Sequence, residues 1–461
     1  MKLKIKKGFD IPIEGCPDVL TKEITGVTTI GIDLSPFSSF QRLKILVKEG
    51  QFIKTGEPIA EYSSFPGTFL TSSGTGYVVA IERGVRRVPL TVVIGTASEE
   101  SFFFHPPLDK ELDKDKVIDF LSSRGLFSHF STRPFNLPAT PYNLPRNIFI
   151  NFSENSPFYP DYILQTEGLG LKDEICSIVE QGIEIVSHLI PHKPHLVYRK
   201  QNERFVSPTV KRMCMLHEIE GPYPSGEPSL HISKISPIKK LSDSTWILNF
   251  YDLIAIGYNA LKDRYLNKKI IGVGGSALAP EDRFFVKVPS GIGVKDVISS
   301  KYSSSDYTII SGSPLTGRKL RHPDKEFLGF RDMNVCCFSI ESKRESFYFM
   351  RLGLNKFTLT NTYLYKLFHG SKTPCSFTTN MHGEKRNFIE ADLYDRFMPM
   401  KIPVIPLIKS ILTENYDQAI RFGFLEVVPE DFALSTFVCP SKNELIDIVR
   451  HGIEDFLSKE S

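Results

Sequence analysis

Residues 48–76 read KEGQFIKTGEPIAEYSSFPGTFLTSSGTG, and this stretch decides the fold of the first hundred residues. Short apolar segments alternate in it with tight turns, and the turn glycines are Gly50, Gly56, Gly67, Gly74 and Gly76. Glycine suits tight backbone reversals because it has no Cβ atom. Alternating apolar residues flank the stretch on both sides, at 43–47, 77–81 and 88–94. Short strands with turns at such close spacing predict a small β barrel or sandwich over residues 1–102.

The same stretch is similar to the swinging-arm region of lipoyl and biotin carrier domains, in which a lysine carries the cofactor. Here no lysine lies between Lys54 and Gly76, and SSFPG at residues 63–67 forms the hairpin tip. We therefore expect a barrel-sandwich hybrid domain, lipoyl- or biotinyl-like, that has no acceptor lysine and acts as a rigid docking module. A carrier or biosynthetic adaptor is an alternative, and it predicts a mass increment from lipoate or biotin.

Length and charge exclude several classes of protein. A chain of 461 residues is long enough for several domains, at about 150 residues each. Its 56 Lys and Arg residues face 53 Asp and Glu residues, so no basic field points to nucleic acid. The basic start MKLKIKK leads into GFDIPIEG, so no signal peptide is predicted. The apolar run at 246–262 has three polar interruptions and is too short to cross a bilayer, so membrane contact is expected only through a partner.

Residues 103–262 are predicted to form a Rossmann-like α/β domain. The pattern predicts a helix over 110–126, a buried strand over 147–151, a helix over 172–182 and a strand at 183–186. Strand, helix and strand in this order are typical of α/β folds. We expect residues 246–262 to form a buried helix that closes this domain.

Residues 263–335 alternate as three strands around one short helix, which favours a β-grasp domain. GVGGSA at 272–277 fits a dinucleotide fingerprint, but Pro280 and an alternating segment at 284–288 follow where a helix must begin, so we predict a tight turn. Residues 336–400 stay an unassigned connecting region. Residues 401–461 are predicted to form a helical C-terminal domain, with a helix over 410–422 and a capping box of Ser441 and Glu444 before the last helix.

Neither a catalytic residue nor a metal site is predicted. The seven cysteines are odd in number and form no C-x-x-C, so reduced buried thiols are expected. His192 and His195 flank Pro194 and are assigned to a surface loop, and His217 and His231 frame a Gly/Pro loop without metal-site spacing. No nucleophile motif appears in a supporting context.

Seven stretches, in order along nearly the whole chain, resemble the NqrA subunit of the sodium-translocating NADH:quinone reductase, a bacterial respiratory membrane complex. These stretches are IKKGFDIPIEGCP, VKEGQFIKTGEPI, SSGTGYVVAIERGVRRV, GLFSHFSTRPF, GPYPSGEPSLHI, IISGSPLTGR and LSTFVCPSK. The resemblance implies a fold related to the NADH- and flavin-binding subunit of respiratory complex I. Its implied parts are a barrel-sandwich hybrid, a Rossmann-like domain, a β-grasp domain of the SLBB or ubiquitin-like kind, and a C-terminal helical domain.

The resemblance also carries expectations about cofactors. In the flavin-binding relatives a glycine-rich loop early in the α/β domain holds FMN and NADH. Here the corresponding stretch, residues 124–138, has Phe127, Phe130 and Phe135 where small residues would be needed. Cys439 is the single cysteine of its stretch, and one thiolate does not hold a four-iron cluster. The flavins, the iron–sulfur cluster and NADH are therefore implied to bind other subunits, and this chain is expected to bind no cofactor.

The resemblance implies a peripheral subunit on the cytoplasmic face of the bacterial inner membrane. The complex to which it belongs transfers electrons from NADH to ubiquinone or another quinone, and it couples this transfer to Na⁺ export. The chain is expected to dock on an integral membrane subunit, with the quinone nearby, and to hold no complete catalytic site. The quinone-proximal candidates are Arg133, Pro134 and Phe135 in one segment and Gly221, Tyr223 and Gly226 in another. The alternative is a free-standing soluble flavin or nicotinamide oxidoreductase with the same fold.

Overall fold

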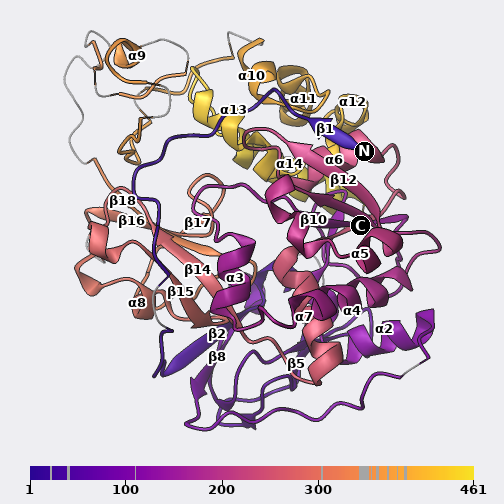
Figure 1. Cartoon of the computed structure of the whole chain (residues 1–461). Coiled ribbons are helices and arrows are strands. Elements are labelled where there is room, and N and C mark those ends of the chain that lie inside the picture. Colours follow the sequence, from indigo (N-terminus) through magenta and orange to yellow (C-terminus); the bar gives the residue numbers. More distant parts are fainter. Residues whose placement is uncertain are drawn as a thin grey trace.

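The computed structural model of the chain describes residues 1–20, 23–38, 42–109, 111–302, 305–341, 352–354, 356–359, 363–370, 373–381, 383–388 and 392–460. Among these residues the strands form four sheets, and a group of C-terminal helices packs on the largest sheet (Figure 1). None of the described helices has the length and apolar character needed to cross a membrane. Part of the connecting region 336–400, including 342–351, lies outside the described residues.

The N-terminal β domain consists of two small sheets that enclose one core. One sheet has the order β2 (Thr29–Asp33), β8 (Pro89–Thr96), β7 (Gly76–Arg83) and β4 (Phe52–Ile53). The other has the order β3 (Leu43–Ile45), β5 (Pro58–Tyr62) and β6 (Phe69–Thr71). Ile53, Ile59 and Val92 are fully buried between them. This arrangement agrees with the predicted sandwich of short strands.

The central sheet has six strands in the order β1 (Lys2–Lys4), β12 (Met215–Glu220), β11 (His195–Tyr198), β10 (Asn147–Phe152), β13 (Thr245–Asn249) and β9 (Ser131–Arg133). All neighbours pair in parallel except β9, which is antiparallel to β13. The predicted strand at 147–151 is confirmed by β10. From β10 the chain adds β11 and β12 on one side and β13 on the other, so the strand order reverses between β10 and β13.

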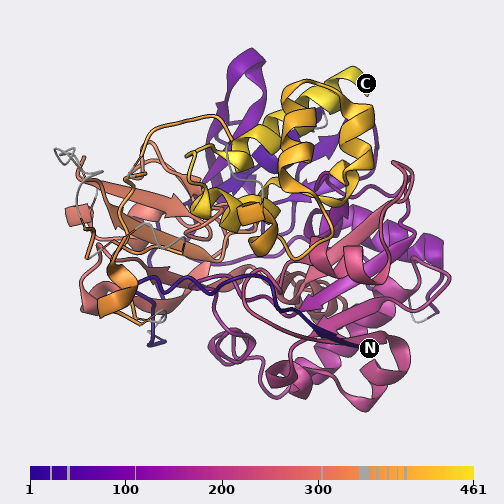
Figure 2. The ribbon, with the colours of Figure 1, turned by 90° about the horizontal axis from the view of Figure 1, so that it is seen from above.

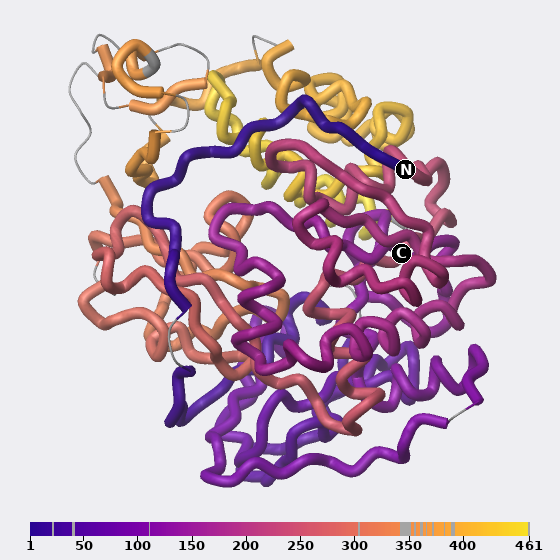
Figure 3. Tube along the Cα trace, in the orientation of Figure 1, coloured from indigo at the N-terminus to yellow at the C-terminus, as the bar shows by residue number. Residues whose placement is uncertain are grey.

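The first strand belongs to this central sheet although it precedes the β domain in sequence. Leu3 of β1 pairs with Ile219 of β12. Figure 3 shows the next residues running from the central sheet to the five-stranded sheet, where Leu20 forms a bridge with Phe285. The N-terminal segment therefore ties the central sheet to the third domain before the chain enters the β domain.

Helices cover both faces of the central sheet (Figure 1). On one face lie α2 (Lys114–Ser123), α3 (Tyr162–Gly168), α4 (Ile175–Ser187), α5 (Pro208–Met213) and α7 (Phe250–Lys262). The apolar residues of α4 and α7 share one core with Trp246 of β13. α6 (Pro228–Ile235) contributes Leu230 and Ile232 to the core on the opposite face.

Three predicted elements of this domain are corrected by the structure. Residues 183–186 continue α4 instead of forming a strand, because Ile183, Ile185 and Val186 all lie on its buried side. Residues 246–249 are a strand, and the helix begins only at Phe250. The helix predicted over 110–126 is shorter in the structure, where α2 begins at Lys114 because the carboxylate of Asp113 caps it by accepting from the N–H of Lys116. Residue 110 lies outside the described part of the chain.

The third domain is a five-stranded sheet in the order β15 (Phe284–Pro289), β14 (Lys268–Gly274), β18 (Asn334–Ser339), β16 (Tyr307–Ser311) and β17 (Arg318–Lys319), with the short helix α8 (Val294–Val297). The GVGGSA segment ends β14 and turns at Gly275, whose φ is +125°. Only a short 3-10 helix at Pro280–Asp282 follows before β15. The predicted tight turn is confirmed.

The C-terminal helices are α10 (Asp392–Phe397), α11 (Val404–Leu412), α12 (Tyr416–Arg421), α13 (Ala433–Val438) and α14 (Leu445–Glu460). They cover the face of the central sheet opposite α4 and α7 (Figures 1 and 2). The single helix predicted over 410–422 is two helices, because Glu414 takes a positive φ and Asn415 caps α12. The predicted capping box is wrong, since α14 begins at Leu445 and Ser441 lies too early to cap it; its hydroxyl donates to the carbonyl of Asn387.

The cysteines follow the prediction only in part. All seven are free, and five of them are buried. Cys16 and Cys176 are exposed. Burial raises the pKa of the Cys214 and Cys337 thiols to about 12.

Candidate functional site

The structure brings the two predicted quinone-proximal segments close to each other through α6, although Arg133 pairs with Thr245 at the amino end of β13 and the 221–226 loop leaves the carboxyl end of β12. Arg133 ends β9, and Pro134 and Phe135 follow it. The 221–226 loop joins β12 to α6. The Nε atom of Arg133 donates to the hydroxyl of Ser229, three residues beyond Gly226, across 3.1 Å.

Arg133 and Phe135 face the inside of the fold. The guanidinium also donates to the carbonyl of Thr132 and to Oδ1 of Asn136, and burial lowers the pKa of Arg133. The ring of Phe135 lies 5.3 Å from the ring of Phe424 and 5.4 Å from that of Phe456, centroid to centroid. The segment therefore fastens the C-terminal helices to the central sheet.

The 221–226 loop is pressed against neighbouring backbone. A Cβ atom at Gly221, where φ is +151°, would lie 2.6 Å from the carbonyl oxygen of Ile5. Gly226 donates its N–H to Oδ1 of Asn155, and its carbonyl accepts from Asn151. A Cβ atom at Gly226 would lie 2.5 Å from the carbonyl oxygen of Ser153, so both positions require glycine. Between them the side chain of Tyr223 is buried, and its hydroxyl has no hydrogen-bond partner among the described residues.

Three carboxylic acids lie around Tyr223, near the carboxyl ends of the parallel strands; Asp431 is buried, and the other two are partly buried. Glu154 follows β10, Glu227 precedes α6, and Asp431 comes from the C-terminal region. Burial raises the pKa of Glu227 well above its usual value, that of Asp431 to about 6, and that of Glu154. Arg199 lies at the same edge, where it donates to the carbonyls of Ser153 and Gly221.

Ligands of open α/β sheets usually bind at this edge, where the strand order reverses. Here the 3-10 helix Pro429–Phe432 and the helix α13 bring buried side chains to it, among them Asp431.

A second candidate site lies where the β domain, the central domain and the five-stranded sheet meet. It is a cavity of about 120 Å³. Its apolar lining includes Leu34, Phe37, Leu126, Leu328, Phe330 and Met333. Its ionisable lining includes Asp33, His129, Asp252 and Arg331. We call it the junction cavity.

A histidine–aspartate pair forms one wall of the junction cavity. The Nδ1 atom of His129 lies 2.8 Å from Oδ1 of Asp252, which is buried in the first turn of α7. The His129 ring packs against Phe330, with centroids 5.5 Å apart, and Phe330 packs edge-on against Phe37. The cavity therefore combines aromatic rings with a fixed imidazole.

Two buried cations hold this wall in place. The Nη2 atom of Arg331 donates to the carbonyls of Ser128 and Phe130, on either side of His129. Lys269 of β14 donates to the carbonyl of Asp332 across 2.7 Å and to that of Gly329 across 3.2 Å. Burial lowers the pKa of Lys269 to about 8. The five-stranded sheet thereby positions the loop that carries Phe330 and Arg331.

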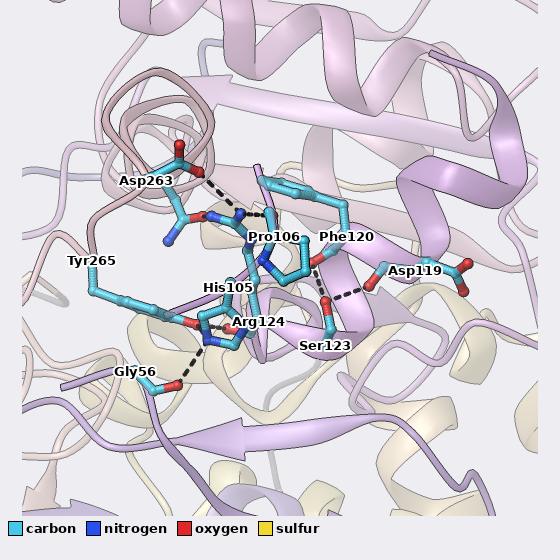
Figure 4. Close-up of polar contacts among 10 residues, drawn as sticks. Gly56, His105, Pro106, Asp119, Phe120, Ser123, Arg124, Asp263 and Tyr265 are labelled. Carbon is cyan, nitrogen blue, oxygen red and sulfur yellow. Dashed lines mark hydrogen bonds and ion pairs between the residues drawn. The ribbon is translucent and has the colours of Figure 1, made fainter. Parts of the chain in front are cut away.

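Arg124 also lines the junction cavity, and its polar contacts are drawn in Figure 4. Its guanidinium donates to Oδ1 of Asn259, to Oδ1 of Asp263 and to the carbonyl of Pro106. Its own carbonyl accepts from the hydroxyl of Tyr265 across 2.7 Å. Figure 4 shows these groups converging from α2, α7 and the segment that leaves the β domain.

The histidines outside the junction cavity follow their predictions in part: His192 is exposed in the loop before β11, and His217 and His231 flank the Gly/Pro loop from β12 and α6. His195 is buried in β11, so its assignment to a surface loop is wrong. Its Nδ1 atom lies 3.0 Å from Nε2 of His217 in β12, and burial lowers the pKa of both imidazoles to about 4. Within the described part of the chain, no group of three or more His, Cys, Asp or Glu side chains is arranged to hold a metal ion.

Comparisons with protein families recover the first two domains. The model described as the NqrA N-terminal barrel-sandwich hybrid domain matches residues 3–97, and the model of the NqrA second alpha/beta domain matches residues 112–263. The predicted barrel-sandwich hybrid domain and the predicted α/β class of the second domain are thereby confirmed. The chain is thus a multidomain protein in which a barrel-sandwich hybrid precedes an α/β domain.

Comparisons with whole proteins extend the similarity to the full chain. The A subunit of the Na(+)-translocating NADH-quinone reductase of Chlamydia pneumoniae is 37% identical, over 100% of this chain and 98% of its own length. The corresponding proteins of Chlamydia caviae and Klebsiella pneumoniae are 37% and 30% identical, over 99% and 96% of this chain and 97% and 96% of their own lengths. The chain therefore belongs to the NqrA family, the A subunits of the Na(+)-translocating NADH-quinone reductase, which is an oxidoreductase complex. This membership confirms the resemblance.

Among solved structures, an air-oxidised NAD⁺-reducing [NiFe]-hydrogenase matches 49% of this chain and 47% of its own with 17% identity and a TM-score of 0.35. That likeness is too low to carry an argument. The predicted boundaries between the domains stay predictions.

Proposed function

We propose that this chain is the peripheral, cofactor-free subunit of the Na⁺-translocating NADH:quinone reductase. It docks at the cytoplasmic face on an integral membrane subunit, and it shapes the quinone end of the reaction. The observation that carries this proposal is the similarity to proteins of that name over 96–100% of the chain. The proposal includes the β-grasp identity of the five-stranded domain and a separate helical C-terminal domain.

The proposal of a subunit without flavin rests on the bulky residues in the stretch that corresponds to the flavin loop of the relatives, and two of these residues pack into the core of the α/β domain. The rings of Phe127 and Phe130 are buried against Trp246, with centroid separations of 5.7 and 5.1 Å. These side chains take up space in the core of the α/β domain. In the flavin-binding relatives that the resemblance implies, the backbone of the corresponding segment approaches FMN closely.

We place the quinone contact at the junction cavity rather than at Arg133 and Phe135. The cavity joins aromatic rings to His129 and Arg331, which present nitrogen groups to a ring carbonyl. Its volume of about 120 Å³ is comparable to that of an engineered protein cavity, about 150 Å³, that binds benzene. By contrast, Arg133 is hydrogen-bonded to Ser229 of α6, and Phe135 packs against Phe424 in the C-terminal region.

The test uses the whole complex, purified from cells that make or lack this chain. We expect the complex without the chain to lose quinone reduction and Na⁺ transport, and to regain both when purified chain is added. NADH oxidation with an artificial acceptor should persist. The purified chain should show no flavin absorbance. A stoichiometric flavin band, or full quinone reduction without the chain, would contradict the proposal.

The cavity is tested separately with two variants of the reconstituted complex. Phe330→Ala opens its aromatic wall, and we expect a higher KM for quinone with NADH oxidation unchanged. Tyr142→Ser, an exposed aromatic residue outside the cavity lining, serves as the matched control. Equal quinone KM values in both variants would place the quinone elsewhere while leaving the assignment to the complex intact.

A further inference from the structure

The β7–β8 hairpin ends in a basic turn that projects from the β domain. In Figure 2 the hairpin extends beyond the neighbouring elements at the upper edge of the view. We define the arginine tip as Arg83, Val85, Arg86 and Arg87. All four side chains are exposed, and Val85 is 87% exposed, the highest value among the exposed large hydrophobic residues of the described chain.

The three guanidiniums of the arginine tip are not neutralised by neighbours. None of them forms an ion pair with a described carboxylate, and their one hydrogen bond among the described residues is from Arg83 Nη1 to the carbonyl of Arg87, across 3.2 Å. Glu82 is the acidic residue next to them. Over the whole chain, 56 basic residues are balanced by 53 acidic ones, so three such arginines within five residues concentrate positive charge at one point.

The backbone of the tip adopts an unfavourable conformation. Arg86 and Arg87 have φ values of +56° and +60°, in the left-handed region that non-glycine residues rarely enter. Such conformations are energetically unfavourable and are concentrated at functional sites. Neither side chain is buried, so packing of the arginine side chains does not offset this cost. Gly84 lets Leu90, itself partly exposed, pack beneath the turn.

We propose that the arginine tip binds the headgroups of an anionic lipid bilayer. Arginine forms paired hydrogen bonds with phosphate, and it carries its charge at every physiological pH. Basic side chains next to an exposed apolar residue are typical of surfaces that combine electrostatic attraction with shallow insertion. The tip presents one apolar side chain among three cations, which is complementary to a layer of phosphates with hydrocarbon beneath it.

This inference goes beyond the proposed function, since it gives the chain a lipid contact of its own. A subunit that docks only on protein partners needs no such contact. The two ideas are therefore tested by separate experiments, and the lipid experiment uses the purified full chain without the rest of the complex.

The experiment is cosedimentation with vesicles of phosphatidylcholine alone or mixed with phosphatidylglycerol. We expect the chain to bind the mixed vesicles and to be released by NaCl, because salt screens exposed charges. Replacing the arginines by R83Q, R86Q and R87Q together should weaken binding by about tenfold or more. The matched control carries K114Q, K295Q and K409Q, which remove the same charge from exposed positions in α2, α8 and α11.

A second measurement reports insertion. Trp246 is the single tryptophan and is fully buried, so it gives a constant background. Val85→Trp should show a blue shift of its added emission on anionic vesicles and none on phosphatidylcholine.

Three results would overturn the proposal. One is absence of binding to the anionic vesicles. Another is equal weakening by the arginine and lysine triple variants, which would mean diffuse charge. The third is an arginine variant that keeps its vesicle binding but no longer associates with the membrane subunits in detergent, which would make the tip a protein contact.

Discussion

The guanidinium of Arg124 donates from Nη1 to Oδ1 of Asn259 across 2.7 Å, and both side chains are withdrawn from solvent. Arg124 lies at the end of α2, and Asn259 lies in the last turn of α7. Because the same arginine also holds Pro106 and Asp263, one side chain fixes α7 against the segment that leaves the β domain.

Arg124→Met should therefore destabilise the protein strongly. It removes a buried charge together with its hydrogen bonds to Asn259, Asp263 and the carbonyl of Pro106, and it leaves the buried Oδ1 of Asn259 without a donor. Removing one partner of such a buried set costs about 3 kcal/mol. The measurement is the free energy of unfolding from urea denaturation. Arg204→Met, at an exposed position, is the control and should change little. An equal effect of both substitutions would show that the Arg124 contacts are not stabilising.

Asp431→Asn should alter how stability depends on pH. Burial raises the pKa of Asp431 from 3.8 to about 6, so the folded protein binds this proton more tightly than the unfolded chain does. The natural protein therefore loses stability as the pH rises from about 4 to about 6, and the loss persists at higher pH. The asparagine variant carries no such charge, and its amide oxygen can still accept from the N–H of Val428.

The expected result is a gain in unfolding free energy for Asp431→Asn relative to the natural protein. The gain should be absent below about pH 4 and should grow to roughly 3 kcal/mol above about pH 6. Denaturation midpoints at a series of pH values measure it. Asp447→Asn, whose carboxylate is half exposed beside Arg450, is the control. A difference between Asp431→Asn and the natural protein that stays constant across the pH range would refute the argument.

Local sequence patterns predicted the elements that are set apart by turns. The strand at 147–151 follows a proline-rich loop, and its apolar run is too short for a helix. By contrast, no turn residue separates β13 from α7, so the sequence pattern predicted a single helix over 246–262 where the structure has a strand and then a helix. Residues 183–186 are mostly β-branched, so their composition predicted a strand, although in the structure they continue α4 and its buried side.

The junction cavity could not be predicted from local pattern. Its ionisable groups come from positions 33, 129, 252 and 331, and only the fold brings these together. One signal was present in the sequence. Asp252 interrupts an apolar run, and a buried carboxylate needs a partner, which the structure supplies as His129. The predicted segments at Arg133 and Gly226 lie close in space because the Arg133 side chain reaches Ser229 in the first turn of α6, a long-range contact that local sequence pattern does not predict.

Gly257→Ala should separate α4 from α7. At their crossing, a Cβ atom on Gly257 would collide with the carbonyl oxygen of Ile178, and one on Gly182 would lie 2.8 Å from the carbonyl oxygen of Leu253. Both neighbours are main-chain atoms and cannot rotate away, so the helices must move apart and loosen the core around Trp246. Overpacking of this kind costs about 1–3 kcal/mol. Thermal and urea unfolding measure the loss. The control is Gly370→Ala, where the nearest atom to the new Cβ is 3.6 Å away, and its effect should stay within about 0.5 kcal/mol. If Gly257→Ala proves as stable as Gly370→Ala, the two helices are not held at contact distance by their glycines.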